Sequence, residues 1–322
     1  MARKPIKTAS SPGQPLDGQG VRRISRLKIV KSNLRISTWN VRSLFAAGKL
    51  SNAIKEMKRI KIRFMGISEL RWPGVGTCAH EGGTLYFSGS AEDDRRHSNG
   101  VGILVDSEFV KYVKGFVPIS DRVMLLQLHG KPFDINLIQI YAPTSEKRYD
   151  DDVEVLYDTI RDTLQSLQSD NVNLVMRDFN AKIGQGRRTD IVGDHGLGES
   201  NERGDRLFEF CQETEMVVTN TWYKLPKRRL YTWKSPLDGG SNPEPVRNQI
   251  DYVLINKRFR NMVRSIKAYP GADIGSDHNP LVTDLTLRLK CVRSGTASKR
   301  IDVSKLRNIE TRKVLHLTSI EN

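Results

Sequence analysis

Apolar runs and amphipathic stretches alternate along most of the chain. Continuous apolar runs of about four to eight residues, such as residues 172–176, indicate buried strands, whereas apolar residues spaced three and four apart indicate helices. Residues 151–169 have the helical spacing, with Val155, Leu156 and Ile160 on one stripe. The pattern predicts helices at 50–61, 151–169 and 204–214, and strands at 34–39, 63–68, 84–88, 100–105, 124–128, 134–141, 172–176, 216–219, 229–233, 249–255 and 281–287.

Some of these strands are separated by a turn and others by a helix. Residues 84–88 and 100–105 flank a polar loop and are expected to form a hairpin, and residues 129–132 are a plausible turn between the next two strands. Strands that are connected both by hairpins and by helices build layered sheets with helices outside. The sequence therefore predicts an α/β fold.

The net charge of +15 is concentrated at the two ends of the chain. Residues 1–32 carry eight Lys or Arg against one acid, and residues 288–322 carry nine against three. Such ends attach loosely to a polyanion through counterion release, although the same composition is typical of solvated tails. We expect a disordered basic leader at 1–32, one domain at 33–289 and a basic tail at 290–322.

Composition excludes several classes of protein. No apolar run reaches the ~18 residues that a membrane-spanning helix needs, and no apolar signal core follows the basic start. The three cysteines, Cys78, Cys211 and Cys291, are far apart and lack the spacing of a zinc site. We expect an intracellular protein without a membrane partner, and its basic ends are compatible with a nuclear location.

Six polar clusters stand where predicted strands end. A single carboxylate at a strand end is usually a turn or cap residue, but six clusters together indicate a shared site. Carboxylate and amide oxygens are the ligands that Mg²⁺ prefers, and an imidazole beside them can contact a phosphate. The set therefore suits phosphodiester hydrolysis. The clusters contain Asn40, Glu69, Tyr141, Asp178 with Asn180, Asp251, and Asp277 with His278.

Seven motifs occur in the order STWNVRSL, SELRW, YAPTSE, DFNAKIG, TWKSP, QIDYVL and SDHNPL. With these motifs, residues 34–289 resemble the endonuclease/exonuclease/phosphatase superfamily, and within it the apurinic-type endonuclease domain of RTE-like non-LTR retrotransposons. The resemblance implies a single four-layered α/β sandwich, in which two packed mixed sheets are flanked by helices and the site lies at the open rim. It also implies metal-site roles for Asn40, Glu69 and Asp277, phosphate contacts from Tyr141, Asn180 and His278, activation of the attacking water by Asp178, orientation of the histidine by Asp251, and substrate contacts from Arg203 and Trp233.

Two features depart from the family pattern. Arg177 stands where the family usually has a glycine before the DFN triplet. Strand alternation points Arg177 away from Asp178 and into the packed interior, where an unpaired guanidinium is costly and a bent strand end would misplace Asp178. The reverse transcriptase of a complete element is also absent, and residues 290–322 resemble the linker toward it.

Three hypotheses remain open. The leading one is a monomeric Mg²⁺-dependent DNA endonuclease of retrotransposon origin, which nicks one strand, leaves a 3′-hydroxyl and accepts Mn²⁺ in place of Mg²⁺. The second is a catalytically inactive remnant that binds DNA or RNA through its basic ends. The third keeps the fold but hydrolyses phosphoinositide or sphingomyelin headgroups; the motifs YAPTS and DFNAKIG favour the nuclease.

Overall fold

The structure is a computed structural model, which describes residues 29–90, 99–143, 150–236 and 246–290. Strand β1 begins at Ile29, so residues 29–32 belong to the folded domain and not to the expected leader. The remaining leader, residues 1–28, and the tail from residue 291 lie outside the described residues. No helix among the described residues is long and apolar enough to cross a membrane.

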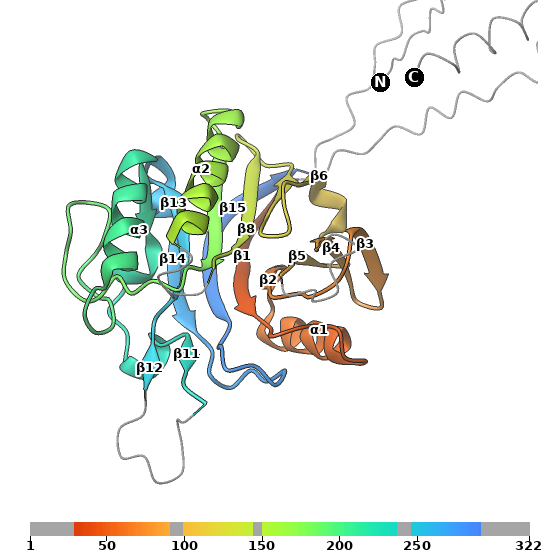
Figure 1. The fold of residues 1–322 in the computed structure, drawn as a ribbon. Helices are drawn as coiled ribbons and strands as arrows, with labels where there is room; N and C mark the ends of the chain where they lie inside the picture. The colour runs from red at the N-terminus through yellow and green to blue at the C-terminus, as the bar shows by residue number, and fades with distance from the viewer. Residues whose placement is uncertain (1–28, 91–98, 144–149, 237–245, 291–322) are drawn as a thin grey trace, which may run out of the picture. The chain divides into compact units, whose positions relative to one another are not determined.

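Two mixed β-sheets form the centre of the domain (Figure 1). The strand order is β14-β15-β1-β2-β5-β4-β3 in the first sheet and β10-β13-β9-β8-β7-β6 in the second. One neighbouring pair in each sheet is parallel, β1 with β2 and β8 with β9, and the other pairs are antiparallel. The first sheet contains β1 (Ile29–Asn40), β2 (Phe64–Ser68), β3 (Val75–His80), β4 (Gly83–Ser88), β5 (Val101–Asp106), β14 (Val263–Ala268) and β15 (Leu281–Lys290); the second contains β6 (Val113–Pro118), β7 (Val123–Leu128), β8 (Ile135–Tyr141), β9 (Val172–Asp178), β10 (Met216–Val218) and β13 (Asp251–Asn256).

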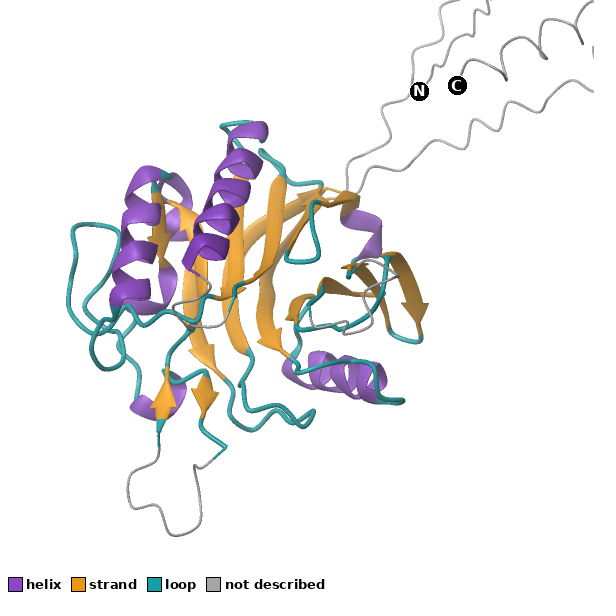
Figure 2. Cartoon of the chain, viewed as in Figure 1, coloured by secondary structure: helices purple, strands orange, loops and turns teal. Residues whose placement is uncertain are grey.

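Helices cover the outer faces of both sheets (Figure 2). One apolar cluster, which includes Phe64 and Met176, lies between the sheets. A second cluster joins α2 and α3 to the six-stranded sheet, and a third joins α1 to the seven-stranded sheet. The four-layered α/β sandwich that the sequence predicted is thereby confirmed. The other elements are α1 (Lys49–Ile60), α2 (Asp150–Ser166), α3 (Glu202–Glu213), the 3₁₀ turns η1 (Val110–Tyr112), η3 (Thr219–Trp222), η4 (Lys227–Arg229) and η5 (Lys257–Met262), and a small sheet of β11 (Trp233–Lys234) and β12 (Arg247–Asn248).

The central strands are apolar on both faces because each face meets another layer. Every residue of β2, β8 and β9 is buried, so most of their residues are apolar. The polar residues within them, such as Asn136 and Gln139 of β8, are buried as well. Helix α1 packs only one face against its sheet and buries Leu50, Ala53, Ile54, Met57 and Ile60 at helical spacing. Cys78 and Cys211 are free thiols.

Two predictions about secondary structure were wrong. The strand expected at 229–233 is instead the 3₁₀ turn η4 followed by β11, which begins only at Trp233. Val155, expected on the apolar face of its helix, is 65% exposed, while Val153, Leu156 and Tyr157 of α2 are buried.

Three strands of the two large sheets, β3, β6 and β14, were not predicted. Each lies at the edge of its sheet. None of the side chains of β3 or β6 is fully buried. The apolar periodicity of an edge strand is weak, because one side of the strand has no neighbour to pack against.

Candidate active site

The two sheets bring the predicted polar residues to one end of the sandwich. Strands β1, β2, β8 and β9 point their carboxyl ends toward this end, where they deliver Asn40, Glu69, Tyr141 and Asp178. Strand β13 is antiparallel to β9, so its first residue, Asp251, lies beside Asp178 in the register. Strand β15 is antiparallel to β1, which places the loop before β15 at the same end.

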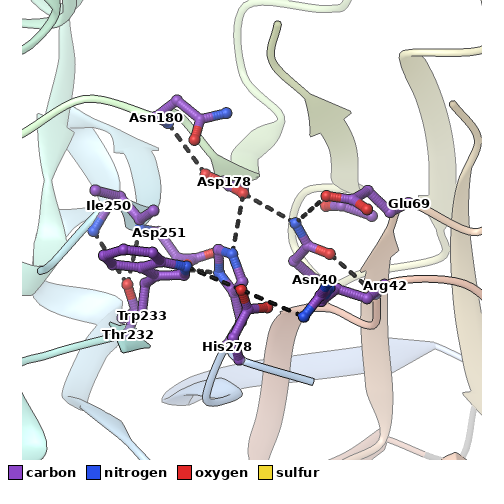
Figure 3. A network of polar contacts seen from close by, with 12 residues as sticks. Asn40, Arg42, Glu69, Asp178, Asn180, Thr232, Trp233, Ile250, Asp251 and His278 are labelled. Carbon is purple, nitrogen blue, oxygen red and sulfur yellow. Dashed lines mark hydrogen bonds and ion pairs between the residues drawn. The ribbon is translucent and has the colours of Figure 1, made fainter. Parts of the chain in front are cut away.

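Asn40 is the centre of a hydrogen-bonded network (Figure 3). Its Nδ2 donates to Glu69 Oε1 at 2.8 Å and to Asp178 Oδ2 at 3.0 Å. The hydroxyl of Tyr141 donates to the same Glu69 oxygen at 3.2 Å, and Arg71 pairs with the other oxygen at 2.8 Å. The residues that end β1, β2, β8 and β9 are thus held together by direct contacts.

His278 lies between two buried carboxylates. Its Nδ1 is 3.0 Å from Asp251 Oδ2, and its Nε2 is 3.7 Å from Asp178 Oδ2. All three side chains are at least nine-tenths buried. Asp251 therefore fixes the orientation of the ring through Nδ1, and Nε2 faces Asp178.

Burial and mutual charge shift the pKa values of this group. Burial raises the pKa of Asp178, Asp251 raises it further, and the opposing effect of His278 is smaller, so the carboxyl is more basic than usual. Burial lowers the pKa of His278, but the charges of Asp251 and Asp178 outweigh it and raise that pKa to about 9. Burial also raises the pKa of the Tyr141 hydroxyl, which stays protonated. His278 is therefore positively charged at neutral pH.

Asn180, Trp233 and Asp277 lie around this group. The backbone N–H of Asn180 donates to Asp178 Oδ1 at 3.0 Å, and Trp233 Nε1 donates to Asp277 Oδ2 at 3.1 Å. A cleft of about 440 Å³ opens here, with Asn180, Trp233, His278, Lys182 and Asn201 among its lining residues.

Arg203 is placed differently from the other predicted site residues. It lies in the first turn of α3, and the hydrogen-bonded network described above does not include it. Its charge contributes to lowering the pKa of Arg177.

Several residues of the site were not expected from the sequence. The Ser276 hydroxyl donates to the Asn40 carbonyl at 2.6 Å and accepts from the His278 N–H at 3.1 Å. The Thr232 hydroxyl accepts from the N–H groups of Ile250 and Asp251, each at 3.0 Å. Ser276 is the first residue of the motif SDHNPL, and Thr232 is the first residue of TWKSP. The sequence does not indicate which groups these hydroxyls bind, because most of the partners lie in other segments of the chain.

Unusual backbone conformations concentrate at this end of the sheets. Among the described residues, eight that are not glycine have a positive φ, and five of them are Arg42 (49°), Ser43 (93°), Glu69 (53°), Arg71 (59°) and Asn180 (49°). Such conformations cost free energy and persist where the surrounding structure enforces them, most often at functional sites.

Arg177 is buried, as strand alternation predicted, at 1% exposure. Its Nε donates to the Asp178 carbonyl at 3.0 Å, and its guanidinium lies over the Phe179 ring at 4.3 Å. Neither of its terminal nitrogens has a hydrogen-bond partner. The strand is not displaced, because β9 keeps unbroken register with β8 and β13 through Arg177 and Asp178.

The residues present fit a divalent cation. Asp178, Asp251 and His278 offer ligand atoms that all lie within 4.8 Å of one another and could hold a metal ion. One carboxylate oxygen of Asp251 and one of Asp277 are buried without a hydrogen-bond partner. Carboxylate oxygens in this state are the donors that a hard divalent cation requires.

The comparisons with known proteins agree with the fold. No family model matches the sequence. The catalytic domain of Xenopus laevis APE2 superposes with a TM-score of 0.62 at 13% identity, over 81% of this chain and 94% of that domain. The endonuclease domain of TRAS1, a telomere-specific non-LTR retrotransposon, superposes with a TM-score of 0.54 at 15% identity, over 78% of this chain and 98% of that domain. The AP endonuclease LMAP of Leishmania major gives a TM-score of 0.58 at 17% identity, over 79% and 87% of the two chains.

The chain therefore has the fold of the AP endonucleases and of a retrotransposon endonuclease domain. In sequence it is a relative of craniofacial development protein 2. It is 39% identical to that protein of Bos taurus over 279 residues, which are 86% of this chain and 45% of the relative, and 39% identical to that of Tragulus javanicus over 274 residues, 84% and 46%. The chain thus spans less than half the length of these two curated relatives.

Proposed function

We propose that the chain is a divalent-metal-dependent DNA endonuclease, which hydrolyses one phosphodiester bond and leaves a 3′-hydroxyl. The observation that carries this proposal is the contact set of His278, whose ring is 3.0 Å from Asp251 and 3.7 Å from Asp178 at the edge of an open cleft. The AP endonuclease fold and the motifs shared with retrotransposon endonucleases make DNA the preferred substrate class.

Of the two candidate donor sets, Glu69, Asp277 and Asn40 would hold the metal ion. In the group of Asp178, Asp251 and His278, the protonated His278 ring has no lone pair to offer a metal. We infer Mg²⁺, with Mn²⁺ as a substitute, because the donors on this side are carboxylate and amide oxygens. When bound, the ion would act as a Lewis acid on a phosphate oxygen. The partnerless oxygen of Asp277 supports its inclusion.

Asp178 is assigned as the general base. A water molecule that it holds attacks phosphorus in line with the 3′-oxygen, and the water proton passes to the carboxylate. The P–O3′ bond breaks, and the departing oxygen takes a proton from solvent to become the 3′-hydroxyl. The raised pKa of Asp178 supports this role, because a more basic carboxylate accepts the proton more readily at neutral pH.

His278 and its neighbours are assigned to the phosphate. The protonated ring would donate a hydrogen bond to the phosphate and stabilise the charge that develops there, while Asp251 fixes the ring. Asn180 and the Tyr141 hydroxyl would contact the other phosphate oxygens. Trp233, and more remotely Arg203, would contact the substrate outside the reacting group.

Arg177 is compatible with activity in this proposal. The register of β9 continues without a bulge through Arg177, so Asp178 keeps the position that its neighbours in β8 and β13 impose. A displaced strand end is one way in which Arg177 could inactivate the site, and the unbroken register does not favour it.

The proposal is tested by incubating the protein with supercoiled plasmid and Mg²⁺ and following nicked circles. We expect wild type to nick, and Glu69→Gln and His278→Ala to lose about 10² to 10⁴-fold in rate, the range for a lost catalytic group. Glu108→Gln is the matched control, because the Glu108 side chain is 73% exposed and its ion pair is with Arg63. Rates equal to the control in both site variants would contradict the assignment. Absence of nicking by wild type with Mg²⁺ and with Mn²⁺ would favour the non-catalytic hypothesis, and release of lipid headgroups instead would favour the lipid phosphodiesterase.

A further inference from the structure

Two stretches beside the candidate active site contain basic residues and no acidic ones. Residues 216–236 and residues 252–272 each hold five Lys or Arg and no Asp or Glu. The two stretches pack against each other: β10 pairs with β13, and the Tyr223 hydroxyl donates to the Val263 carbonyl at 2.7 Å. Their charges therefore gather on one side of the domain, along the edge strands β10 and β14.

Most of these charges are exposed, and an acidic residue near them, Asp190, interacts electrostatically with Arg260. Lys224, Lys227, Arg228 and Arg264 are exposed, and Arg260 is half-buried. We refer to these five residues as the basic surface. Within the described part of the chain, the ion pairs of the two stretches are those of Lys257 with Asp190 and Arg258 with Asp170, and neither cation belongs to the basic surface.

The Trp222 ring packs against two arginine side chains. The guanidinium of Arg260 lies 4.3 Å from the centre of the Trp222 ring, and that of Arg187 lies 5.4 Å from it. A guanidinium stacked on an aromatic ring keeps its charge and loses little further freedom when it binds an anion. The arginines are thus ordered before any partner arrives.

The surface is also concave. A hollow of about 570 Å³ is lined by Trp222, Tyr223, Arg260, Asn261, Val263 and Arg264. Concave surfaces of one sign of charge concentrate the electrostatic potential and attract counterions of opposite sign.

One end of the basic surface lies near the candidate active site, and the surface extends from there along β14 to Arg264 and Arg260, which lie at the opposite ends of β14 and β13 from the site. Turn η4, which contains Lys227 and Arg228, is four residues before Trp233, and Trp233 lines the cleft together with His278. Arg229 of the same turn donates to the Ala268 carbonyl at 3.2 Å, which fixes η4 against the end of β14. Figure 1 shows β11, β12, β13 and β14 on the side of the domain away from α1 and β3.

We propose that the basic surface binds the phosphate backbone of the DNA on one side of the cleavage site. This inference rests on the proposed function, which supplies the DNA strand in the cleft. A duplex that passes through the cleft carries a regular row of phosphates onto the neighbouring surface, and ordered guanidinium and ammonium groups bind phosphates through counterion release and charged hydrogen bonds.

Fluorescence anisotropy of the full chain with a labelled 30-base-pair duplex, in EDTA to prevent cleavage, tests the proposal over a range of salt concentrations. Two double variants remove the charge, Lys227→Glu with Arg228→Glu and Lys224→Glu with Arg264→Glu. We expect each to raise Kd by about tenfold or more and to lower the slope of log K against log salt by about two, since each phosphate contact contributes about one unit.

The matched control is Lys55→Glu with Lys58→Glu, which makes the same change in net charge on α1, where both lysines are exposed. We expect its Kd to change by less than about threefold, because charges beyond a Debye length are screened. If the basic-surface variants show the same Kd and the same slope as this control, the proposal is overturned, and the surface would suit an acidic protein instead. The binding measured in EDTA does not depend on cleavage, so a failure of plasmid nicking with intact surface-dependent binding would remove the proposed function alone.

Discussion

Burial of the Arg177 guanidinium costs free energy that its contacts repay only in part. The side chain has one hydrogen bond, from Nε to the Asp178 carbonyl, and it lies near the rings of Phe179 and Tyr157. Burial lowers its pKa to about 10. Two terminal nitrogens without partners leave a positive charge inside a layer of apolar side chains, which is among the costlier arrangements in a protein interior.

Arg177→Met is expected to raise the free energy of unfolding by about 1–3 kcal/mol, because a buried charge without a full set of partners is replaced by an apolar side chain of similar length. Urea unfolding followed by circular dichroism measures the change. Arg177→Lys keeps the charge and loses the Nε hydrogen bond, so it should give no gain. A Met variant less stable than wild type would show that the contacts to the two rings outweigh the desolvation of the guanidinium.

The residue that caps α3 also contacts the loop that lines the cleft. Asn201 precedes the helix in an extended conformation, and its Oδ1 accepts from the N–H groups of Gly204 and Lys182, both at 2.9 Å. Gly204 has no room for a side chain, because a Cβ there would lie 1.8 Å from the Lys182 carbonyl oxygen. The helix start and the loop after β9 are therefore fixed to each other by one side chain and one glycine.

Asn201→Ala is expected to lower the free energy of unfolding by about 1–2 kcal/mol, because it removes the acceptor for two N–H groups, one of them in the first turn of a helix. Asn201→Asp keeps the acceptor and is the control, expected to change stability by less than about 0.5 kcal/mol. Urea denaturation of the three proteins decides between them. Equal losses in Ala and Asp would mean that the amide nitrogen of Asn201, and not its oxygen, contributes the stability.

Elements with two buried faces could be predicted from the sequence, and elements at sheet edges could not. Strands β2, β8 and β9 are buried along their whole length and consist mostly of apolar residues, so their short apolar runs could be recognised as buried strands. Strands β3 and β6 mix exposed and half-buried side chains, so their sequence resembles that of a loop. Val155 was wrongly assigned to the buried face of its helix for a related reason. An apolar residue beside the buried face cannot be distinguished by local spacing from a residue on that face.

In the first sheet, Asp284 of β15 links its own strand to both neighbouring strands, β1 and β14. Its side chain pairs with Arg35 of β1 at 2.7 Å, and it accepts from the Ser265 hydroxyl of β14 at 2.8 Å. Partial burial raises the pKa of Asp284, but the hydrogen bonds from Arg35 and Ser265 outweigh it and hold that pKa below its ordinary value. The ionised carboxylate is thus the form that the folded state favours.

The stabilisation from Asp284 should depend on pH in a defined direction. A carboxyl whose pKa is lower in the folded state stabilises the fold above its ordinary pKa of 3.8 and loses that effect as pH falls through the lower folded value. We expect Asp284→Asn to be less stable than wild type at pH 6, with a difference that shrinks below pH 4. Urea unfolding of both proteins across that range measures it. A difference that stayed constant to acidic pH would assign the effect to packing instead of charge.

The sequence by itself determined the layers and the identity of the polar residues. Its apolar runs set which strands are buried, its helical stripes set which faces pack, and six polar clusters at strand ends marked the residues that now lie together. These properties are local, since each depends on a periodicity of a few residues or on the type of one side chain.

Only the tertiary structure decided how those residues meet. His278 is oriented by Asp251 and not by Asp277, its neighbour in the sequence, and Asn40 joins Glu69 to Asp178. Ser276 and Thr232 hold the loops at this end. These contacts follow from the antiparallel pairing of β13 with β9 and of β15 with β1. The gathering of basic residues on one side has the same origin, because η4, η5 and β14, which carry most of them, are brought together only in the folded domain. The contacts that orient His278 and that join Glu69 to Asp178 connect residues 27 to 138 positions apart and leave no trace in a local pattern, because the free energy that selects them comes from packing of the complete sandwich.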